Sequence, residues 1–171
     1  MNIQNLRKLV LASCFASLCT VLTMVIQIPS PMQGYVNLGD CAVLLSAWIL
    51  GPIYGGAAAG IGSMLADLLS GYAHYAPATL GIKFLMGFCA AVLFQLLRNH
   101  NLFFGQLVSG AASGVILVFG YFAFACLWLG KGLAAAASIP GNIVQALFGL
   151  VAATLVYSAL SRSHALSRIQ Q

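Results

Sequence analysis

Long apolar runs, separated by short segments rich in proline, glycine or charge, make up most of this chain. A helix that crosses a bilayer needs about 20 consecutive, mostly apolar residues. The runs predict six helices, at about Leu9–Ile28, two within Cys41–Gly71, Leu80–Leu97, Leu102–Leu129 and Ile139–Leu160. The pattern therefore predicts an all-α, polytopic membrane protein built as a six-transmembrane-helix bundle.

Proline and glycine mark the predicted helix ends. Pro29 and Pro31 prevent the first helix from continuing, and Gly51-Pro52 divides the second apolar run into two short helices. Pro140 suits the first turn of the sixth helix, where its missing N–H is harmless. Two of the remaining segments form polar loops, at Met32–Gly39 and Tyr72–Thr79.

Composition narrows the class of protein further. The chain has 171 residues, of which 61% are hydrophobic and 5% charged, and its mean hydropathy is +0.99. A soluble domain needs a more polar surface than this. Because six spans use most of the length, residues 1–171 are expected to form a single integral membrane domain in contact with lipid. The formal net charge of +5 is explained by membrane topology, so no nucleic-acid partner is expected.

The cations also predict an orientation. Lys131 is the loop cation on one side of a six-span arrangement, and five lie on the other side, Arg7, Lys8, Arg98, Arg162 and Arg168. Because cytoplasmic loops are enriched in Lys and Arg, both termini are expected in the cytoplasm. The two polar loops then share the outer face.

Three charged residues, Asp40, Asp67 and Lys83, lie within or beside apolar runs. A charge at the centre of a bilayer costs roughly 2.5–3.5 kcal/mol on insertion scales, so such residues pair, face a cavity or bind a ligand. Together with Asn142, they approach the predicted outer face from four helices. The sequence therefore predicts a polar binding site for a small molecule, open to the outside.

Each of these residues also has a structural interpretation. Asp67 and Lys83 could neutralise each other as a pair between the third and fourth helices. Asp40 could be the N-cap of the second helix, where a carboxylate accepts from free N–H groups. Asn142 and Gln145, three residues apart, share a helix face and could form hydrogen bonds within the bundle.

Aromatic side chains near the predicted site could stack on a small ring. The candidates are Tyr35, Trp48, Tyr72, Tyr75 and Trp128. Any one of them could instead belong to the aromatic belt at a membrane interface.

Small residues at helical spacing predict close helix contacts. Gly56 and Gly60 form a G-x-x-x-G pattern, which favours packing within the bundle. Ala12 and Ala16 share one face of the first helix, and their spacing fits either internal packing or contact with another protein.

Several motifs in sequence order resemble the substrate-binding S components of energy-coupling factor (ECF) vitamin transporters. They are RKLVLASCFASLCTVL at residues 7–22, GYVNLGD ending at Asp40, Ile49-Leu50-Gly51-Pro52, ADLLSGYAHYAPAT at residues 66–79, and Ile82-Lys83. The resemblance covers about Arg7 to Tyr157. It implies an S-component fold in a prokaryotic plasma membrane.

The resemblance also implies a function and partners. Family members capture a vitamin or precursor outside the cell, and a module of one transmembrane coupling subunit and two ATPase subunits drives its release inside. By position, Ala12 and Ala16 match the contact with the coupling subunit. The loop holding Asn37 and Asp40 matches one that closes over the substrate, and the loop holding Tyr72, His74 and Tyr75 matches a second lid.

The stretch SGYAHYAPATLGIK most resembles S components associated with hydroxymethylpyrimidine or pyridoxine-like precursors. S components for nickel or cobalt are expected to have a histidine near the N-terminus, where this chain has Asn2. His74, His100 and His164 lie far apart in the predicted topology, so neither a metal site nor a cofactor is expected.

Two other classes of function share some of these sequence features. An autonomous secondary transporter or channel would not require ATPases, although inverted repeats are not evident. An intramembrane serine protease is suggested by Gly60-Ile61-Gly62-Ser63, but no histidine is placed to act as base. No paired-histidine zinc motif is present either, so the chain is not expected to be an enzyme. The chain also lacks a Walker A pattern, so it is not expected to hydrolyse ATP itself, and the energy for transport is expected to come from its partners.

Overall fold

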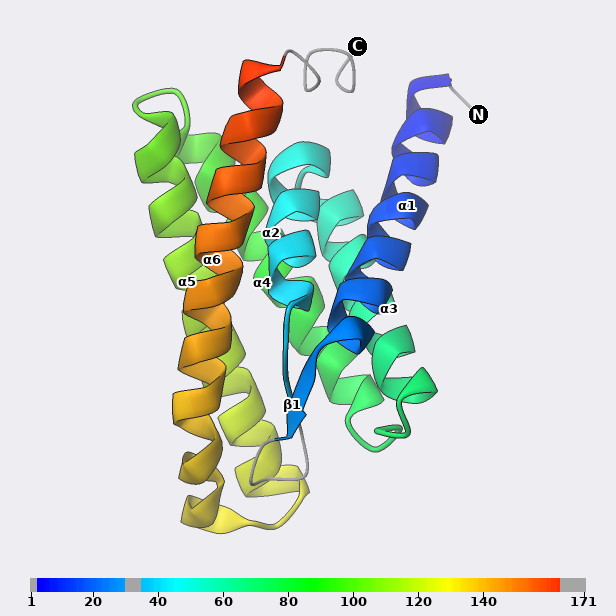
Figure 1. Cartoon of the computed structure of the whole chain (residues 1–171), viewed down its shortest axis with the longest axis vertical. Coiled ribbons are helices and arrows are strands. Elements are labelled where there is room, and N and C mark those ends of the chain that lie inside the picture. The colour runs from blue at the N-terminus through cyan, green and yellow to red at the C-terminus, as the bar shows by residue number, and fades with distance from the viewer. Residues whose placement is uncertain (1–2, 30–34, 164–171) are drawn as a thin grey trace.

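The structure is a computed structural model that describes residues 3–29 and 35–163. Six α-helices run up and down a bundle, with both ends of the described chain at one end of it (Figure 1). We call this the terminal end, and the opposite end the hairpin end. The helices are α1 (Ile3–Val25), α2 (Gly39–Leu50), α3 (Pro52–Leu69), α4 (Ala76–Leu97), α5 (Leu102–Ala123) and α6 (Ile139–Arg162). The predicted six-helix, all-α bundle is confirmed.

A short hairpin is added to the helices. Strand β1 (Gln27–Pro29) pairs antiparallel with β2 (Tyr35–Asn37), so that Ile28 lies opposite Val36. The first helix therefore ends at Val25, three residues before the predicted Ile28, and half of the predicted Met32–Gly39 loop is strand or helix. Met32 itself lies outside the described residues.

The other helix boundaries are close to prediction. Gly51 has φ of 84°, a conformation that suits glycine, and it separates α2 from α3 as expected. Helix α4 begins at Ala76, four residues before the predicted Leu80, so the predicted Tyr72–Thr79 loop is shorter. Two further helical segments connect α5 to α6, a π-helix η1 (Phe124–Trp128) and a 3-10 helix η2 (Gly132–Ser138).

Helix α2 lies at the centre of the bundle and is buried along nearly its whole length. It packs against α1, α3, α4 and α6, which explains why its sequence is apolar on every face. Its 12 residues rise about 18 Å, and the three residues of β2 add about 10 Å. Together they approach the roughly 30 Å thickness of a bilayer core.

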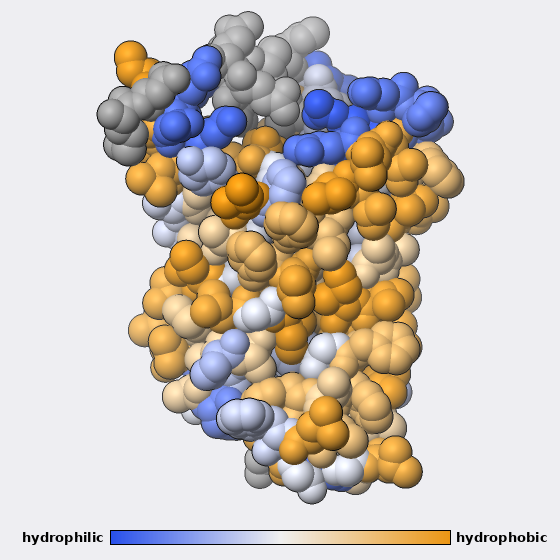
Figure 2. Space-filling model, turned by 180° about the vertical axis from the view of Figure 1, so that it is seen from behind, coloured by the Kyte–Doolittle hydropathy of each residue, from blue (hydrophilic) through white to orange (hydrophobic). Residues whose placement is uncertain are grey.

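Long apolar helices surround this centre. By length and composition, four described segments could cross a membrane: Ile3–Val25, Ala76–Leu97, Leu102–Trp128 and Gly132–Arg162. Figure 2 shows apolar side chains over the middle of one face and polar side chains gathered at the terminal end. Such a band is expected of a protein whose sides contact lipid.

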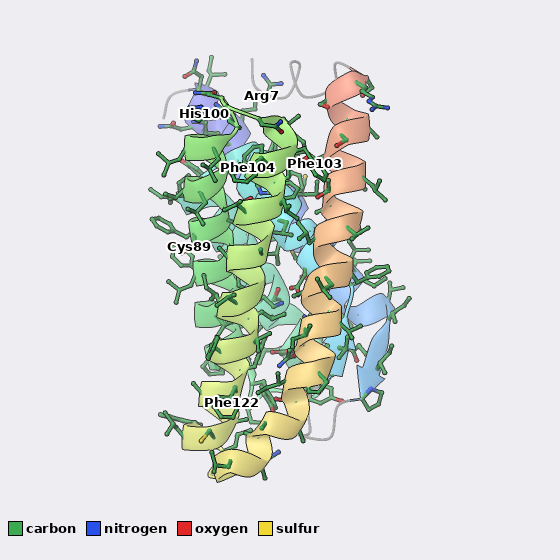
Figure 3. The ribbon with its side chains drawn as sticks, turned by 90° about the vertical axis from the view of Figure 1, so that its left-hand side faces the viewer. Arg7, Cys89, His100, Phe103, Phe104 and Phe122 are labelled. Carbon is green, nitrogen blue, oxygen red and sulfur yellow. The ribbon has the colours of Figure 1, made fainter. Side chains whose placement is uncertain are left out.

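Most of the cations lie at the terminal end. Figure 3 shows Arg7 and His100 there, and Lys131 lies in the connection between η1 and η2 at the hairpin end. Arg168, His164 and Asn2 lie outside the described residues. The distribution agrees with the expected separation of charge, and the cytoplasmic placement of the termini stays a prediction.

Candidate functional site

A cavity of about 50 Å³ lies near the hairpin end, enclosed by α1, β2, α3, α4, α5, η1, η2 and α6. Its lining is unusually polar for so apolar a molecule. It includes the charged residues Asp67 and Lys83 and the aromatic residues Tyr35, Tyr75 and Tyr121. The uncharged polar side chains are Thr23, Asn37, Ser63, Thr79, Ser138, Asn142 and Gln145.

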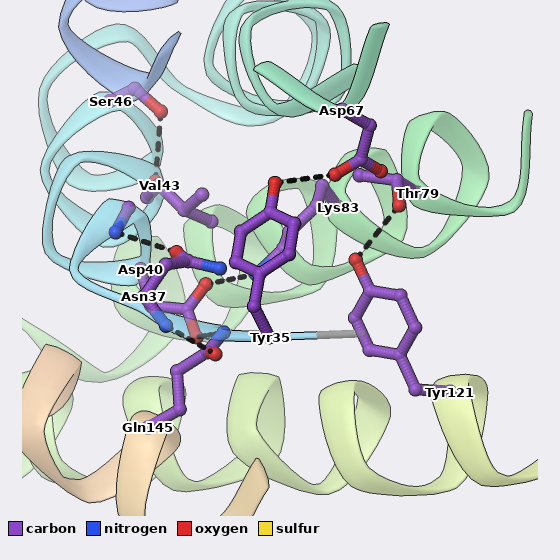
Figure 4. A network of polar contacts seen from close by, with 11 residues as sticks. Tyr35, Asn37, Asp40, Val43, Ser46, Asp67, Thr79, Lys83, Tyr121 and Gln145 are labelled. Carbon is purple, nitrogen blue, oxygen red and sulfur yellow. Dashed lines mark hydrogen bonds and ion pairs between the residues drawn. The ribbon is translucent and has the colours of Figure 1, made fainter. Parts of the chain in front are cut away.

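One side of the cavity is built on a buried ion pair. Lys83 of α4 pairs with Asp40 of α2, and both side chains are nearly inaccessible to solvent. Gln145 of α6 donates from Nε2 to Oδ2 of Asp40 over 2.8 Å, and its Oε1 accepts from the backbone N–H of Asn37 over 2.9 Å. The Asn37 side chain accepts in turn from the N–H of Gly39 over 2.8 Å (Figure 4). This network fixes β2 and the start of α2 against α4 and α6.

Two structural interpretations of the sequence are therefore wrong. Lys83 pairs with Asp40, not with Asp67, because Asp40 faces α4 from the first turn of the central helix. Asp40 is not an N-cap either. Leu38 holds that position without a side-chain cap, and the Asp40 carboxylate is used by Lys83 and Gln145.

Asp67 occupies a different part of the cavity. The hydroxyl of Tyr35 donates to its Oδ1 over 2.6 Å, and the Tyr35 ring lies 4.7 Å, centroid to centroid, from that of Tyr72. Among the described residues, neither Oδ2 of Asp67 nor Oγ of Ser63 has a hydrogen-bond partner, although both atoms are buried. Ser63 and Asp67 are one turn apart on α3, and both line the cavity.

Tyrosine rings form the wall near α5. The Tyr121 hydroxyl and Oγ1 of Thr79 share a hydrogen bond of 3.0 Å, and Nζ of Lys83 lies 5.9 Å from the centre of the Tyr121 ring. Tyr75, in the turn before α4, lies 6.3 Å from Tyr121 between ring centroids. Burial, and secondarily the charge of Asp67, raises the pKa of Tyr75, so its hydroxyl stays protonated.

The structure brings five of the eight predicted binding residues to the cavity wall: Asn37, Asp67, Tyr75, Lys83 and Asn142. Asp40 lies behind Lys83 as its ion-pair partner. Tyr72 and His74 are not part of the wall, but they pack on Tyr35 and Tyr75, which are. That these residues bind a ligand stays a prediction.

Two of the aromatic candidates do not line the cavity. Trp48 packs against Phe94 and Tyr157 in the core and donates from Nε1 to Oγ of Ser109 over 2.9 Å. Trp128 is 81% exposed. Neither forms part of the cavity wall, so stacking by these two residues is not supported.

The sequence reasoning missed several lining residues that helix periodicity could have found. Ser63 precedes Asp67 by four residues, and Thr79 precedes Lys83 by four. Residues four apart on a helix share a face. Including the residue one helical turn before Asp67 and before Lys83 would thus have added the hydroxyls of Ser63 and Thr79 to the predicted site.

The small residues mediate close helix contacts. Gly56 and Gly60 of α3 approach Phe84 of α4, in keeping with internal packing. Ala12 is buried, and the carbonyl of Ala16 lies so close to Gly62 that a Cβ there would collide with it. The face of α1 with the alanines thus packs partly on α3. Their contact with another protein stays a prediction.

The described residues contain no group of three or more His, Cys, Asp or Glu side chains that could hold a metal ion. The cavity wall offers hydrogen-bonding groups and aromatic rings.

Comparisons with known proteins identify a matching family model, a relative and a similar solved structure. A family model described as "ECF-type riboflavin transporter, S component" matches residues 3–162. A protein of Pyrococcus woesei, described as "Uncharacterized protein in gap 3'region", is 38% identical over 134 residues, covering 77% of this chain and 86% of the relative. A solved structure described as "Structure and mechanism of the S component of a bacterial ECF transporter" has a TM-score of 0.66 at 21% identity, covering 92% of this chain and 97% of that one.

Proposed function

The chain belongs to the ECF-type riboflavin transporter S component family, and we propose that it binds a small heteroaromatic vitamin or vitamin precursor beside Asp67. ECF S components are the substrate-binding subunits of transporters and not enzymes. They work with an ECF module that contains a membrane coupling subunit and ATPases.

The observation that carries the proposal is the pair of unpartnered polar atoms on α3. Oδ2 of Asp67 and Oγ of Ser63 are buried, face the cavity and have no hydrogen-bond partner among the described residues. Leaving such a group unsatisfied costs about 1–3 kcal/mol. A ligand that supplies a donor to Asp67 and a polar atom to Ser63 would remove this cost.

The charges and rings favour a ligand class. Asp40 neutralises Lys83, which leaves Asp67 as the carboxyl group with free hydrogen-bonding capacity in the wall. A ring that carries amino or hydroxyl groups matches this need, and Tyr75 and Tyr121 offer aromatic surfaces to it. Hydroxymethylpyrimidine and pyridoxine both have this chemistry.

Cavity size favours a single-ring ligand over a larger one. The volume of about 50 Å³ is well below the roughly 300–1,000 Å³ of pockets for drug-sized ligands, so even a small ring requires some outward movement of the wall. Riboflavin, with three fused rings and a ribityl chain, requires more. It is the second candidate because the family description names it.

Calorimetric titration of the detergent-purified chain with hydroxymethylpyrimidine, pyridoxine, thiamine, riboflavin and pantothenate tests the proposal. One of the two single-ring compounds should bind with a Kd below about 1 µM. Ser63→Ala and Asp67→Asn should each weaken binding by about 1–3 kcal/mol. Ser113→Ala is the matched control, because Ser113 also has a buried, unpartnered hydroxyl but does not line the cavity.

The possible outcomes separate the candidates. Tight binding of riboflavin alone would replace the single-ring assignment with the second candidate. Equal losses in the Ser63 and Ser113 variants would show that the α3 hydroxyl has no special role in binding. Uptake into liposomes that contain this chain alone would instead support an autonomous transporter.

The predicted contact with the coupling subunit can be tested on α1. Ala16 is half-buried, whereas the adjacent Ser17 is exposed on a different face. Ala16→Leu should prevent co-purification with the coupling module and abolish uptake, while ligand binding by the isolated chain persists. Ser17→Leu is the control and should preserve uptake. If Ala16→Leu also preserves it, the predicted contact is wrong.

A further inference from the structure

A second and larger cavity lies at the terminal end of the bundle. Its volume is about 320 Å³, and it lies between α1, the α2–α3 turn and the end of α4. Three cations contribute to its wall, Arg7 and Lys8 from α1 and Arg98 from the end of α4, together with the amide of Gln95. This cavity shares no lining residue with the one beside Asp67.

Among the described residues, no acidic side chain lines this cavity or pairs with Lys8 or Arg98. The sequence contains two acidic side chains, and both belong to the other end of the bundle, where Asp67 lines the first cavity and Asp40 pairs with Lys83. The like charges of Lys8 and Arg98 at one cavity repel each other, and an anion in that cavity would relieve the repulsion.

Helix electrostatics do not account for the cluster. Arg98 follows the last residue of α4 and can interact favourably with the negative end of its dipole. Arg7 and Lys8, however, lie near the N-terminus of α1, the positive end of a helix. The dipole therefore explains one cation of the three.

Part of the wall is apolar. Leu11, Ile49 and Leu50 line the same cavity as the cations, and α1 above and below them exposes large apolar side chains. A free inorganic anion gains nothing from an apolar wall, whereas a phospholipid brings a phosphate and a hydrocarbon chain together. Basic pockets between membrane helices are typical sites for anionic lipid headgroups.

We propose that this cavity binds the phosphate of an anionic phospholipid, with Lys8 and Arg98 as its cationic contacts and Leu11 and Leu50 beside the acyl region. The site is independent of the proposed substrate. A bound lipid would link α1 to the end of α4 at the membrane surface.

Native mass spectrometry of the full-length chain in detergent, titrated with phosphatidylglycerol or phosphatidylcholine, tests this proposal. Phosphatidylglycerol should bind at least tenfold more tightly. The Lys8→Gln/Arg98→Gln double variant should lose about 25-fold in affinity, since each cation near a membrane surface contributes about fivefold. Lys8→Arg/Arg98→Lys retains both charges and should bind within about twofold of the parent.

Arg162→Gln is the matched control, because Arg162 is an exposed cation at the same end of the bundle that does not line the cavity. It should leave lipid affinity unchanged. A loss equal to that of the double variant would show diffuse attraction and overturn the proposal. Equal affinities for phosphatidylglycerol and phosphatidylcholine would also overturn the proposal. Displacement of the lipid by millimolar inorganic phosphate would assign the cavity to a free anion.

Discussion

The charges of Asp40 and Lys83 depend on each other, because both side chains are almost fully buried. Removing one member of such a pair leaves an uncompensated buried charge, which costs about 3–5 kcal/mol. Asp40→Asn or Lys83→Met alone should therefore lower the free energy of unfolding by about that amount. The double variant should recover part of the loss.

Thermal unfolding of the purified variants in detergent, followed by thiol-reactive dye, measures the effect. Asp67→Asn is the control, since Asp67 has no ion pair in the described structure and should change stability less. If the double variant were as unstable as the sum of the singles, the two residues would not be coupled.

The position of the site was predictable at the level of residues, but its pairings were not. Charge within apolar runs pointed to Asp67 and Lys83, and both line the cavity. The choice of Asp40 as partner of Lys83 depends on how α2 is rotated at the centre of the bundle, which no local pattern records. Tyr121 was missed because an aromatic residue in an apolar helix is indistinguishable by sequence from a core residue.

At the scale of elements, the contact between α1 and α3 depends on a small residue at Gly62. A Cβ there would lie within 2.7 Å of the Cys19 Cβ and would also meet the Ala16 carbonyl, so α1 would have to move away. Thr20 donates from Oγ1 to the Gly62 carbonyl over 2.8 Å, a bond that this movement would break. Gly62→Ala should therefore destabilise the protein, by about 1–3 kcal/mol.

Gly81→Ala in α4 is the matched control. No atom lies within 4 Å of a Cβ at that position, and alanine favours a helix over glycine by about 1 kcal/mol. The Gly81 variant should be as stable as the parent or slightly more stable in the same unfolding measurement. If Gly62→Ala unfolded at the same temperature as Gly81→Ala, the close contact between α1 and α3 would be contradicted.

Helix positions were predictable because proline and glycine mark their ends, as Gly51-Pro52 does between α2 and α3. The hairpin was not, because two strands of three residues are too short to show a period of two. The polar loop predicted at Met32–Gly39 nevertheless indicated that the first helix ends before it. Extended backbone inside a bundle is tolerated where its polar groups are satisfied, as Gln145 satisfies the N–H of Asn37.

The orientation of the whole molecule follows from its cations. Arg7, Lys8, Arg98 and Arg162 lie at the terminal end, with Lys131 at the other. A reporter that is active only outside the membrane should be inactive when fused to the C-terminus and active when inserted after Lys131. Its cytoplasmic counterpart, a fluorescent protein, should show the reverse. Activity of the external reporter at the C-terminus would invert the topology.

The shortness of α2 has a consequence for how the protein is made. A nascent segment of 12 residues that contains Asp40 is a poor substrate for the translocon, which admits segments by length and hydrophobicity. We therefore expect α2 to leave the translocon together with α3, as one helical hairpin. The Asp40 carboxylate then lacks its partners until Lys83 is synthesised 43 residues later and Gln145 is synthesised 105 residues later. The central helix of the finished bundle thus acquires its polar partners only after α4 and α6 have been synthesised.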